Sequence, residues 1–478
     1  MSMNTSMVDG AMRIEGKKVI GKQLINVINP FDNSLVGTVT KASLDDVNRA
    51  IKFAKSYKCT LTRFQRAEIL KSAAKLLAER KEEASNLITL ESGLCKKDSL
   101  YEIGRVSDVL NFSAAEALKD DGQAFWCDLT PHGKKRRVFT QRDPLLGVIT
   151  AITPFNHPMN QVAHKVAPSI ASGNRMVLKP SEKTPLAAYF LADILYESGL
   201  PPEMLQVLNG DPAEIADRLI THPDVDLITF TGGVEIGKKI ASIAGYKRLI
   251  LELGGNDPLI VMEDADLDEA ASLAVNGSYK NSGQRCTAVK RIMVQESVAD
   301  EFVHLLVEKS KSWSYGNPMD LNIDMGTVID EDAAILFESR VNEAVKSGAV
   351  LLLGNHRSGA LYSPTVLDKV KPEMSLVKFE TFGPVSPVMR FKTIDEAIHM
   401  VNSTAFGLSS AVCTNRFDYI TKFISELQVG SVNIREVPGY RLELTPFGGI
   451  KDSGLGYKEG VQEAIKSFTN IKTFSLPW

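Results

Sequence analysis

Residues 145–152 (LLGVITAI) and 226–233 (DLITFTGG) are short runs rich in β-branched residues, and the way in which such runs recur decides the fold. Between them lie amphipathic stretches of helical length, among them TPLAAYFLADILYESG at 184–199. That stretch ends in a glycine and is soon followed by Pro201, which is a common end of a helix. Strands that alternate with helices in this way predict a parallel, doubly wound sheet.

A second series of the same kind begins near Pro258. It contains the runs PLIVM at 258–262 and RIMVQ at 291–295, a long helical stretch through Ala270 to about Tyr279, and the helical stretch VADEFVHLLVEKSKSW at 298–313. The sequence therefore predicts an α/β chain with two doubly wound open-sheet domains.

Two segments, residues 118–143 and residues 463–478, do not follow the alternation of strands and helices, and both have extended character. Strands detached from a chain's own sheets usually add to the sheet edge of a neighbour. We therefore expect a β-strand oligomerisation arm and a homodimer or homotetramer. The remainder is expected to divide into a first domain of 1–117 and 144–254, a second domain of 255–445, and a segment, 446–462, that returns to the first.

The composition excludes several classes of protein. The chain has 478 residues, and its 55 Lys and Arg against 58 Asp and Glu leave a formal charge of −3, so there is no basic excess for nucleic-acid binding. The four basic residues at 134–137 are expected to lie exposed to solvent at the beginning of a strand. The first sixteen residues lack the apolar centre of a secretory signal, and no apolar run reaches about eighteen residues. We therefore expect a cytoplasmic protein that binds neither nucleic acid nor membranes.

One cysteine stands out from the other four. The cysteines at 59, 95, 127, 286 and 413 are odd in number and form no CxxC pair, and no HxxxH or HExxH occurs. We therefore expect no disulfide framework, no metal, and mostly buried, unreactive thiols. Cys286 is the exception, because it lies in the polar stretch NSGQRCTAVKR at 281–291. A nucleophilic thiolate needs partial exposure and nearby positive charge or amide dipoles, and this stretch offers both.

Motifs spread over nearly the whole chain resemble those of the aldehyde dehydrogenase superfamily, in order and in spacing. They are Asn156 in TPFNHP, Lys179 and Glu182 in LKPSE, FTGGVEIG at 230–237, Glu252 in LELGG, Cys286 in GQRC, Glu380 and Phe382 in ETFGP, and PFGGIKDSG at 446–454. The resemblance implies an NAD-dependent oxidoreductase. Its first domain would be the Rossmann-like NAD-binding domain and its second the catalytic domain.

The resemblance also implies a catalytic role for three residues. Cys286 would attack the aldehyde, Asn156 and the backbone N–H of Cys286 would hold the oxyanion, and Glu252 would activate the water that releases the thioester. Two plainer interpretations stay open: Asn156 as the cap of a helix that begins after Pro158, and Glu252 as a strand-end carboxylate paired with a lysine. An acylating enzyme that uses coenzyme A needs no such base, so Glu252 favours hydrolysis to the free acid.

No GxGxxG fingerprint occurs, so the resemblance implies that the dinucleotide is bound by other residues than in the standard Rossmann motif. The residues implied are Ile152, Thr153, Pro154 and Phe155 on the nicotinamide side, Lys179 and Glu182 at the adenine ribose, Gly210, Phe230, Thr231, Gly232, Gly233 and Ile236 beside the pyrophosphate, and Glu380 and Phe382 at the nicotinamide ribose, with Ser181 and Leu253 completing the set. A carboxylate at 182 repels a 2′-phosphate, so we expect NAD over NADP. Position 233 is Gly where the family commonly has Ser, which removes one hydroxyl contact to phosphate.

Four residues near the nucleophile point to an anionic substrate: Arg105, His157, Arg285 and Arg441. Guanidinium groups bind phosphate and carboxylate through paired hydrogen bonds, so three of them with a histidine favour a tetrahedral dianion on a short aldehyde. Within the family, the resemblance implies phosphonoacetaldehyde, oxidised to phosphonoacetate, in aminophosphonate breakdown. The alternatives are lactaldehyde, succinic semialdehyde and, outside catalysis, a silent NAD-binding scaffold. Arg285 has the further alternative of lowering the pKa of the neighbouring thiol.

Overall fold

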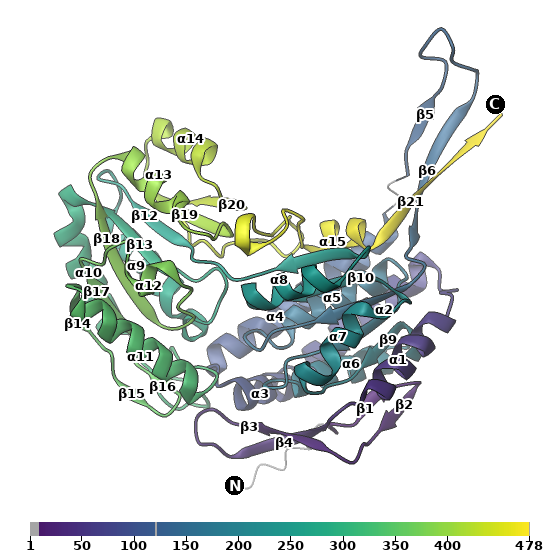
Figure 1. Ribbon diagram of the computed structural model, residues 1–478, viewed down its shortest axis with the longest axis horizontal. Coiled ribbons are helices and arrows are strands. Elements are labelled where there is room, and N and C mark those ends of the chain that lie inside the picture. The colour runs from purple at the N-terminus through teal and green to yellow at the C-terminus, as the bar shows by residue number, and fades with distance from the viewer. Residues whose placement is uncertain (1–8, 120–121, 478) are drawn as a thin grey trace.

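The structure is a computed structural model that describes residues 9–119 and 122–477. The expected ranges 1–117, 118–143 and 463–478 therefore fall partly outside the described residues. Its first sheet has the strand order β11-β10-β7-β8-β9-β1-β2 (Figure 1). The strands are β1 (Met12–Ile14), β2 (Lys17–Val19), β7 (Val148–Ile152), β8 (Met176–Lys179), β9 (Leu205–Val207), β10 (Val225–Thr231) and β11 (Arg248–Glu252). From β11 to β9 the pairing is parallel, which confirms the predicted doubly wound sheet, and the antiparallel edge of β1 and β2 was not predicted.

Helices cover both faces of this sheet because neighbouring strand residues point to opposite sides. Val148 packs on one face and Ile149 on the other, and both are fully buried. One face carries α2 (Arg63–Glu79), α3 (Lys81–Ser92), α4 (Lys96–Leu118), α5 (Asn160–Ala171), α6 (Leu186–Glu197) and α15 (Val461–Ser467); the other carries α1 (Leu44–Ser56), α7 (Pro212–Thr221) and α8 (Val234–Ile243). The sequence did not predict the layer formed by α2, α3 and α4.

The second sheet has the order β14-β17-β18-β13-β12-β19-β20 and is parallel except for β14. Its strands are β12 (Pro258–Val261), β13 (Arg291–Gln295), β14 (Val350–Leu353), β17 (Thr365–Asp368), β18 (Val385–Phe391), β19 (Ser409–Cys413) and β20 (Ser431–Ile434). One face packs on α9 (Leu267–Tyr279) and α10 (Ala299–Lys311), and the other on α11 (Glu331–Lys346), α12 (Ser375–Lys378), α13 (Ile394–Asn402) and α14 (Phe417–Glu426). The expected second α/β unit is therefore confirmed.

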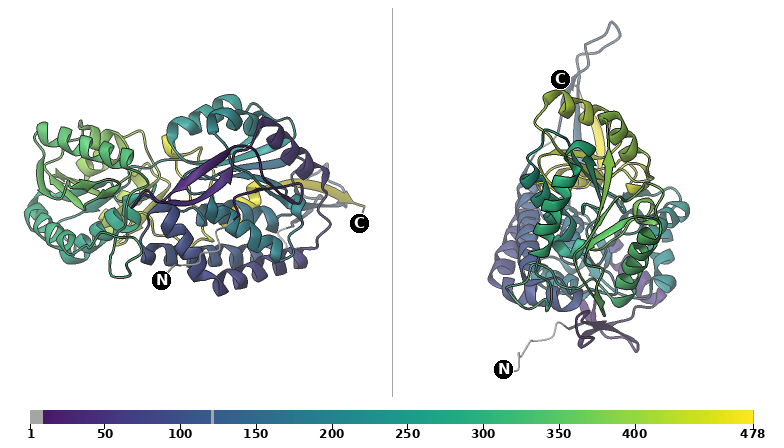
Figure 2. Two further views of the ribbon diagram at one scale, coloured as in Figure 1. Left: turned by 90° about the horizontal axis from the view of Figure 1, so that it is seen from below. Right: turned by 90° about the vertical axis from the view of Figure 1, so that its left-hand side faces the viewer.

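The segments that break the rhythm form a separate antiparallel sheet, ordered β21-β6-β5, of β5 (Ala124–Trp126), β6 (Arg137–Pro144) and β21 (Thr469–Leu476). This sheet projects away from the body of the molecule (Figures 1 and 2). Smaller elements are the hairpins β3 (Leu24–Ile28) with β4 (Leu35–Thr40) and β15 (Arg357–Ser358) with β16 (Leu361–Tyr362), and 3-10 turns at Pro202–Met204, Lys280–Gly283, Glu296–Val298 and Lys451–Ser453.

The two sheets meet where a site is expected. In parallel α/β sheets ligands bind outside the carboxyl ends of the strands, and β7, β8, β10 and β11 all end at one edge. From Glu252, the last residue of β11, the chain crosses within six residues to β12 of the second sheet. Residues 446–454 return to this junction, where Gly454 forms a bridge with Glu252 and the N–H of Leu253 donates to the carbonyl of Ser453 over 3.0 Å.

Among the described residues, none of the helices combines the length and the apolar character that crossing a lipid bilayer requires.

Candidate functional site

The turn that leads into Cys286 has an unusual backbone. Asn281, Ser282 and Gly283 have φ angles of 61°, 53° and 70°, in the left-handed region. At Gly283 a side chain has no room, because a Cβ atom would lie 2.3 Å from the carbonyl oxygen of Gly383. A left-handed serine costs about 1–3 kcal/mol and persists only when its surroundings hold it in place.

Hydrogen bonds from other segments hold this turn. The N–H of Asn281 donates to the Asp98 carboxylate of α4 over 2.7 Å, and its side-chain amide donates to the carbonyl of Asn156 over 2.9 Å. In return, the side-chain amide of Asn156 donates to the carbonyl of Gln284 over 2.7 Å. The loops that carry Asn156 and Cys286 are thus fixed against each other.

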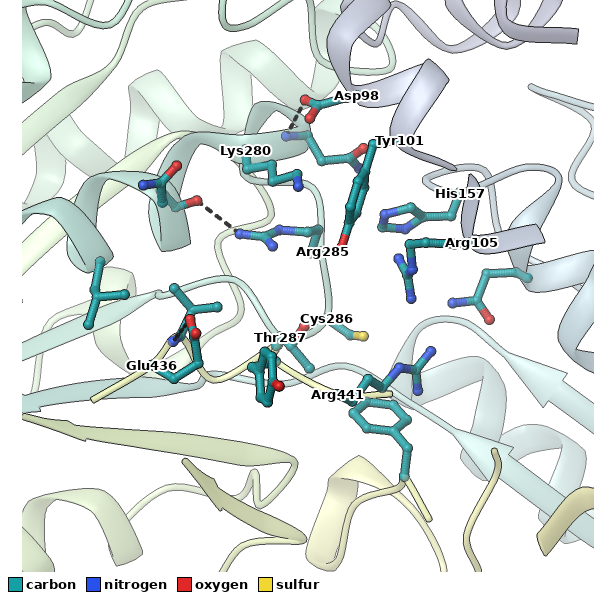
Figure 3. Close-up of a pocket in the computed structure, with 18 residues that line it drawn as sticks. Asp98, Tyr101, Arg105, His157, Lys280, Arg285, Cys286, Thr287, Glu436 and Arg441 are labelled. Atoms are coloured by element: carbon teal, nitrogen blue, oxygen red, sulfur yellow. Dashed lines mark hydrogen bonds between the residues drawn. The ribbon is translucent and has the colours of Figure 1, made fainter. Parts of the chain in front are cut away.

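Cys286 lies at the junction of two cavities. One has a volume of about 330 Å³ and contains Arg105, His157, Arg285 and Arg441, the four residues predicted to bind an anion (Figure 3). The other has a volume of about 190 Å³ and is lined by Pro154, Phe155, Asn156, Gln161, Thr231, Gly232, Gly233, Glu252, Leu253, Gly254, Glu380 and Phe382. Cys286 and Gln161 line both. The thiol can therefore reach molecules on either side.

The thiol is not ionised by its surroundings alone. Burial raises the pKa of Cys286 to about 11, against the opposing positive charges of Lys290 and Arg441. Arg285 does not supply this charge, because its guanidinium points the other way and donates to the carbonyls of Asn276 and Gly277 over 3.1 and 2.7 Å (Figure 3). At neutral pH the thiol needs a base to become a nucleophile.

Glu252 is a buried carboxyl group in the smaller cavity. Neither of its oxygens has a hydrogen-bond partner among the described residues. Burial, together with the negative charge of Glu459, raises the pKa of Glu252 well above its usual value. Glu459 itself is held by the ammonium group of Lys165, 2.6 Å away. A carboxyl group with a raised pKa and no partner is suited to accept a proton near neutral pH.

The larger cavity is rich in positive charge, and a buried carboxylate organises part of it. Glu443 accepts hydrogen bonds from Nε of Arg105 and, over 2.5 Å, from Nε2 of His164, and Nη2 of Arg441 lies 3.6 Å away. Burial acts to raise the pKa of Glu443, but His164, Arg441 and Arg105 hold it far below its usual value. Since the Arg105 bond uses only Nε, the remaining guanidinium N–H groups can donate to an anion.

The opposite wall of this cavity holds Arg285 and Lys280. The Lys280 ammonium lies 3.4 Å from the centre of the Tyr101 ring, and burial, with Arg285 and Arg105, lowers its pKa. The pKa of His157 is also lowered well below its usual value by burial and by the arginines, so its ring is neutral at pH 7. His157 can therefore donate or accept one hydrogen bond without adding charge.

Eight of the predicted cofactor residues line the smaller cavity: Pro154, Phe155, Thr231, Gly232, Gly233, Leu253, Glu380 and Phe382. The other eight do not line it: Ile152, Thr153, Lys179, Ser181, Glu182, Gly210, Phe230 and Ile236. Most of these lie on or directly after β7, β8, β9 and β10, along the same sheet edge, and Ile236 lies in the first turn of α8.

The residues present fit a dinucleotide. Gly233 is exposed and stands at the N-terminus of α8, where backbone N–H groups favour a phosphate. Lys179 pairs with Glu182 over 3.3 Å. The hydroxyl of Thr231 is buried without a partner among the described residues. Among those residues no group of three or more His, Cys, Asp or Glu side chains is arranged to hold a metal ion.

Sequence reasoning missed several residues of the site. Asp98 and Tyr101 lie on the face of α4 that carries the predicted Arg105, at spacings of three and four, a pattern that the sequence could have revealed. Glu443 and Lys280 carried no such signal, because their neighbours come from distant segments.

The expectation that most thiols are buried was wrong: Cys95 and Cys413 are buried, whereas the cysteines at 59, 127 and 286 are partly exposed.

Comparison with known sequences and structures gives a consistent result. The sequence model of the aldehyde dehydrogenase family matches residues 17–474. The 3-sulfolactaldehyde dehydrogenase of Priestia megaterium is 39% identical over 477 residues, 100% of each chain. The sulfoacetaldehyde dehydrogenase of Neptuniibacter caesariensis is 39% identical over 455 residues, 94% of this chain and 99% of that one. The solved NADP-dependent glyceraldehyde-3-phosphate dehydrogenase of Bacillus halodurans, complexed with NADP, is 36% identical, with a TM-score of 0.95 over 98% of this chain and 99% of that one.

The Glu443 cluster generates a prediction about stability. Glu443→Gln leaves the partly buried Arg105 and Arg441 without their carboxylate, which costs about 3 kcal/mol at pH 7, the lower end of the range for a buried ion pair. Because the folded-state pKa is lowered, the carboxylate stabilises the protein fully above the unfolded pKa of about 4.3, and this contribution is lost as the pH falls further. Scanning calorimetry should therefore give a lower Tm for the variant at pH 7, with a difference from the parent that narrows below about pH 4.

The exposed Glu301, substituted as Glu301→Gln, serves as the control. An equal Tm for Glu443→Gln and Glu301→Gln at pH 7 would contradict a stabilising role of the cluster.

Proposed function

Because this chain belongs to the aldehyde dehydrogenase family, we propose that it oxidises a small anionic aldehyde to its carboxylic acid through a thioester on Cys286. Family membership confirms the expected class, an oxidoreductase that uses a nicotinamide cofactor. The observation that carries the proposal is the place of Cys286 between a cavity rich in cationic side chains and a cavity that holds Glu252, Asn156 and Glu380.

Attack on the aldehyde requires a thiolate and a place for the charge that develops on oxygen. Glu252 lines the same cavity as Cys286 and is the group available to accept the thiol proton. The Asn156 side chain donates one N–H to the Gln284 carbonyl over 2.7 Å, and its Nδ2 also lies 3.4 Å from Nδ1 of His157. An oxyanion would replace this second, longer contact, and the backbone N–H of Cys286 is the other donor to the oxyanion.

Oxidation of the carbon attached to sulfur requires the cofactor, which we place in the smaller cavity. The nicotinamide ring, when bound, accepts a hydrogen with two electrons from the carbon attached to sulfur. Glu380 and Phe382 line this cavity beside Cys286, so they are the residues we assign to the nicotinamide ribose. Pro154, Phe155 and Thr231 line it from the first sheet.

Hydrolysis completes the reaction and frees the thiol. Glu252 first releases the thiol's proton to solvent, then takes a proton from water as the water attacks the thioester carbon, and passes this proton to the departing sulfur. Burial is the main cause of the raised pKa of Glu252, the charge of Glu459 adds to it, and Lys165, which pairs with Glu459, opposes it. The product is the free acid.

The substrate class follows from the charges around the larger cavity. Its described lining contains the cations Arg105, Lys280, Arg285 and Arg441 against the carboxylates Asp98 and Glu436, and the neutral His157 adds a hydrogen-bonding group. Arg285 already donates to two carbonyls, so we assign the direct anion contacts first to Arg105 and Arg441 and to Arg285 through its partnerless Nε.

We propose phosphonoacetaldehyde, oxidised to phosphonoacetate, because the excess of cations suits a tetrahedral dianion. The second candidate is a sulfonated aldehyde, favoured by the two relatives named for sulfolactaldehyde and sulfoacetaldehyde, since a sulfonate has the same tetrahedral shape with one charge less. Lactaldehyde and succinic semialdehyde complete the panel of substrates whose kcat/KM values decide the choice.

Two further assignments are proposals of the same kind. The projecting sheet of β5, β6 and β21 exposes Phe125, Trp126 and Ile471, which suits pairing with a second copy in a homodimer or homotetramer. Residues 1–117 and 144–254 are assigned to the NAD-binding domain, 255–445 to the catalytic domain, and 446–462 to the segment that returns to the first.

Replacement of the base tests both of its roles. Glu252→Gln should lower kcat by about 10²–10⁴-fold, because the thiol and the attacking water then both lack their base. The acyl-Cys286 that does form should persist, because its hydrolysis is slowed, and it should be seen by mass spectrometry. In the parent enzyme kcat should rise with pH as Glu252 loses its proton, and because its pKa is raised, this rise should come at a higher pH than an ordinary glutamate would give. A parent kcat that is constant between about pH 6 and 9, or a fully active variant, contradicts this role.

Replacement of one arginine tests the anion site. Arg441→Gln should raise KM for phosphonoacetaldehyde about 10- to 150-fold, which corresponds to about 1.5–3 kcal/mol for a lost charged hydrogen bond. The KM for acetaldehyde, which carries no anion, should change less than about threefold, and Arg441→Lys, which keeps the charge, should fall between. Equal losses on both aldehydes would rule out an anion site at Arg441.

Cofactor preference depends on Glu182. We propose NAD over NADP, although the solved relative from Bacillus halodurans binds NADP. The parent should show a higher kcat/KM with NAD, and Glu182→Gln should raise the kcat/KM for NADP at least about tenfold by removing the repulsion of the 2′-phosphate. A parent that prefers NADP contradicts the position given to Glu182.

A further inference from the structure

Lys290 is a buried lysine four residues after Cys286, and 3% of its surface is exposed. Its ammonium group has three N–H donors, and each has a partner. They donate to the carbonyl of Cys286 over 2.6 Å, to the carbonyl of Gly255 over 2.8 Å and to Oε1 of Glu380 over 2.9 Å. A buried ammonium with every donor satisfied holds its partners in one arrangement.

The three partners come from three different segments. Gly255 follows β11 of the first sheet, Cys286 ends the left-handed turn, and Glu380 precedes β18 of the second sheet. They approach so closely that a Cβ atom on Gly255 would lie 2.6 Å from the Cys286 carbonyl oxygen, and one on Gly254 would lie 2.2 Å from Oε2 of Glu380. The two glycines of LELGG are therefore required by this junction.

We propose that Lys290 is a positioning residue that couples the cofactor site to the nucleophile. It holds Glu380 in the orientation that receives a ribose hydroxyl, and it holds the backbone of Cys286 at the same time. Oε1 of Glu380 also accepts the N–H of Gly255 over 3.1 Å, so Oε2 is left for the ribose. The proposal rests on the proposed function for the identity of the cofactor.

Lys290 also contributes charge at the thiol. The charged groups that act most strongly on Cys286 are Lys290 and Arg441, which favour the thiolate, and Asp257 and Glu380, which oppose it; Arg285 also interacts with the thiolate. Removal of the ammonium removes the largest of the favourable charges. The positioning role and the charge role therefore predict different responses to a neutral hydrogen-bond donor.

The test compares Lys290→Met, which removes donors and charge, with Lys290→Gln, which keeps an amide donor without charge. The first measurement is the Kd for NAD by fluorescence titration. The second is the pH profile of Cys286 alkylation by iodoacetamide, followed by mass spectrometry of its peptide because Cys59 and Cys127 are also partly exposed. Lys96→Met is the control, since Lys96 is equally buried at 4% exposure and its ammonium bonds Ser85 and Asn86.

Lys290→Met should weaken NAD binding about 10- to 100-fold and move the alkylation profile upward by about one pH unit. Lys290→Gln should recover part of the NAD affinity but keep the displaced profile, and Lys96→Met should change neither. A Kd within about twofold of the parent with an unchanged profile would overturn the proposal. If Lys290→Met does not fold, an unchanged alkylation profile in Lys290→Gln overturns it equally.

Neither measurement uses an aldehyde. If no substrate of the panel is oxidised while both measurements respond as expected, the proposed substrate fails and the role of Lys290 stands.

Discussion

The site depends on one reciprocal contact between loops of the two sheets. The Asn156 amide donates to the carbonyl of Gln284, and the Asn281 amide donates to the carbonyl of Asn156. Without this pair the left-handed turn at 281–283 would relax, because a non-glycine residue with positive φ is stable only when its surroundings hold it. The position of Cys286 between two cavities follows directly from that turn.

Burial then sets the chemistry of the groups that the turn brings together. It raises the pKa values of Cys286 and Glu252, where nearby cations oppose it only in part, and it is overcome at Glu443, where two guanidinium groups and a histidine surround the carboxylate. The same desolvation therefore yields two groups that hold their protons more tightly than usual and one fixed anion that orients cations. The two outcomes differ only in the partners that each group has.

The glycines of LELGG link this chemistry to the fold. Gly254 and Gly255 lie where the chain leaves the first sheet, and they admit Glu380 and the Cys286 carbonyl at distances that a side chain would forbid. Lys290 fills the resulting space with a cation that satisfies all three of its donors. The segment that connects the two sheets therefore also forms part of the site.

The sequence by itself determined the parts that depend on local pattern. Alternating strands and helices specified two doubly wound sheets, the two segments that break that rhythm specified the projecting strands, and the motifs around Asn156, Glu252 and Cys286 specified the family. It also grouped Arg105, His157, Arg285 and Arg441 correctly at one cavity. Tertiary structure alone decided the partners of these arginines, because Arg285 donates to helix carbonyls whereas Arg105 and Arg441 lie against Glu443. The physical reason is that a side chain's charge can be read from its type, whereas its partners and its desolvation depend on segments hundreds of residues away.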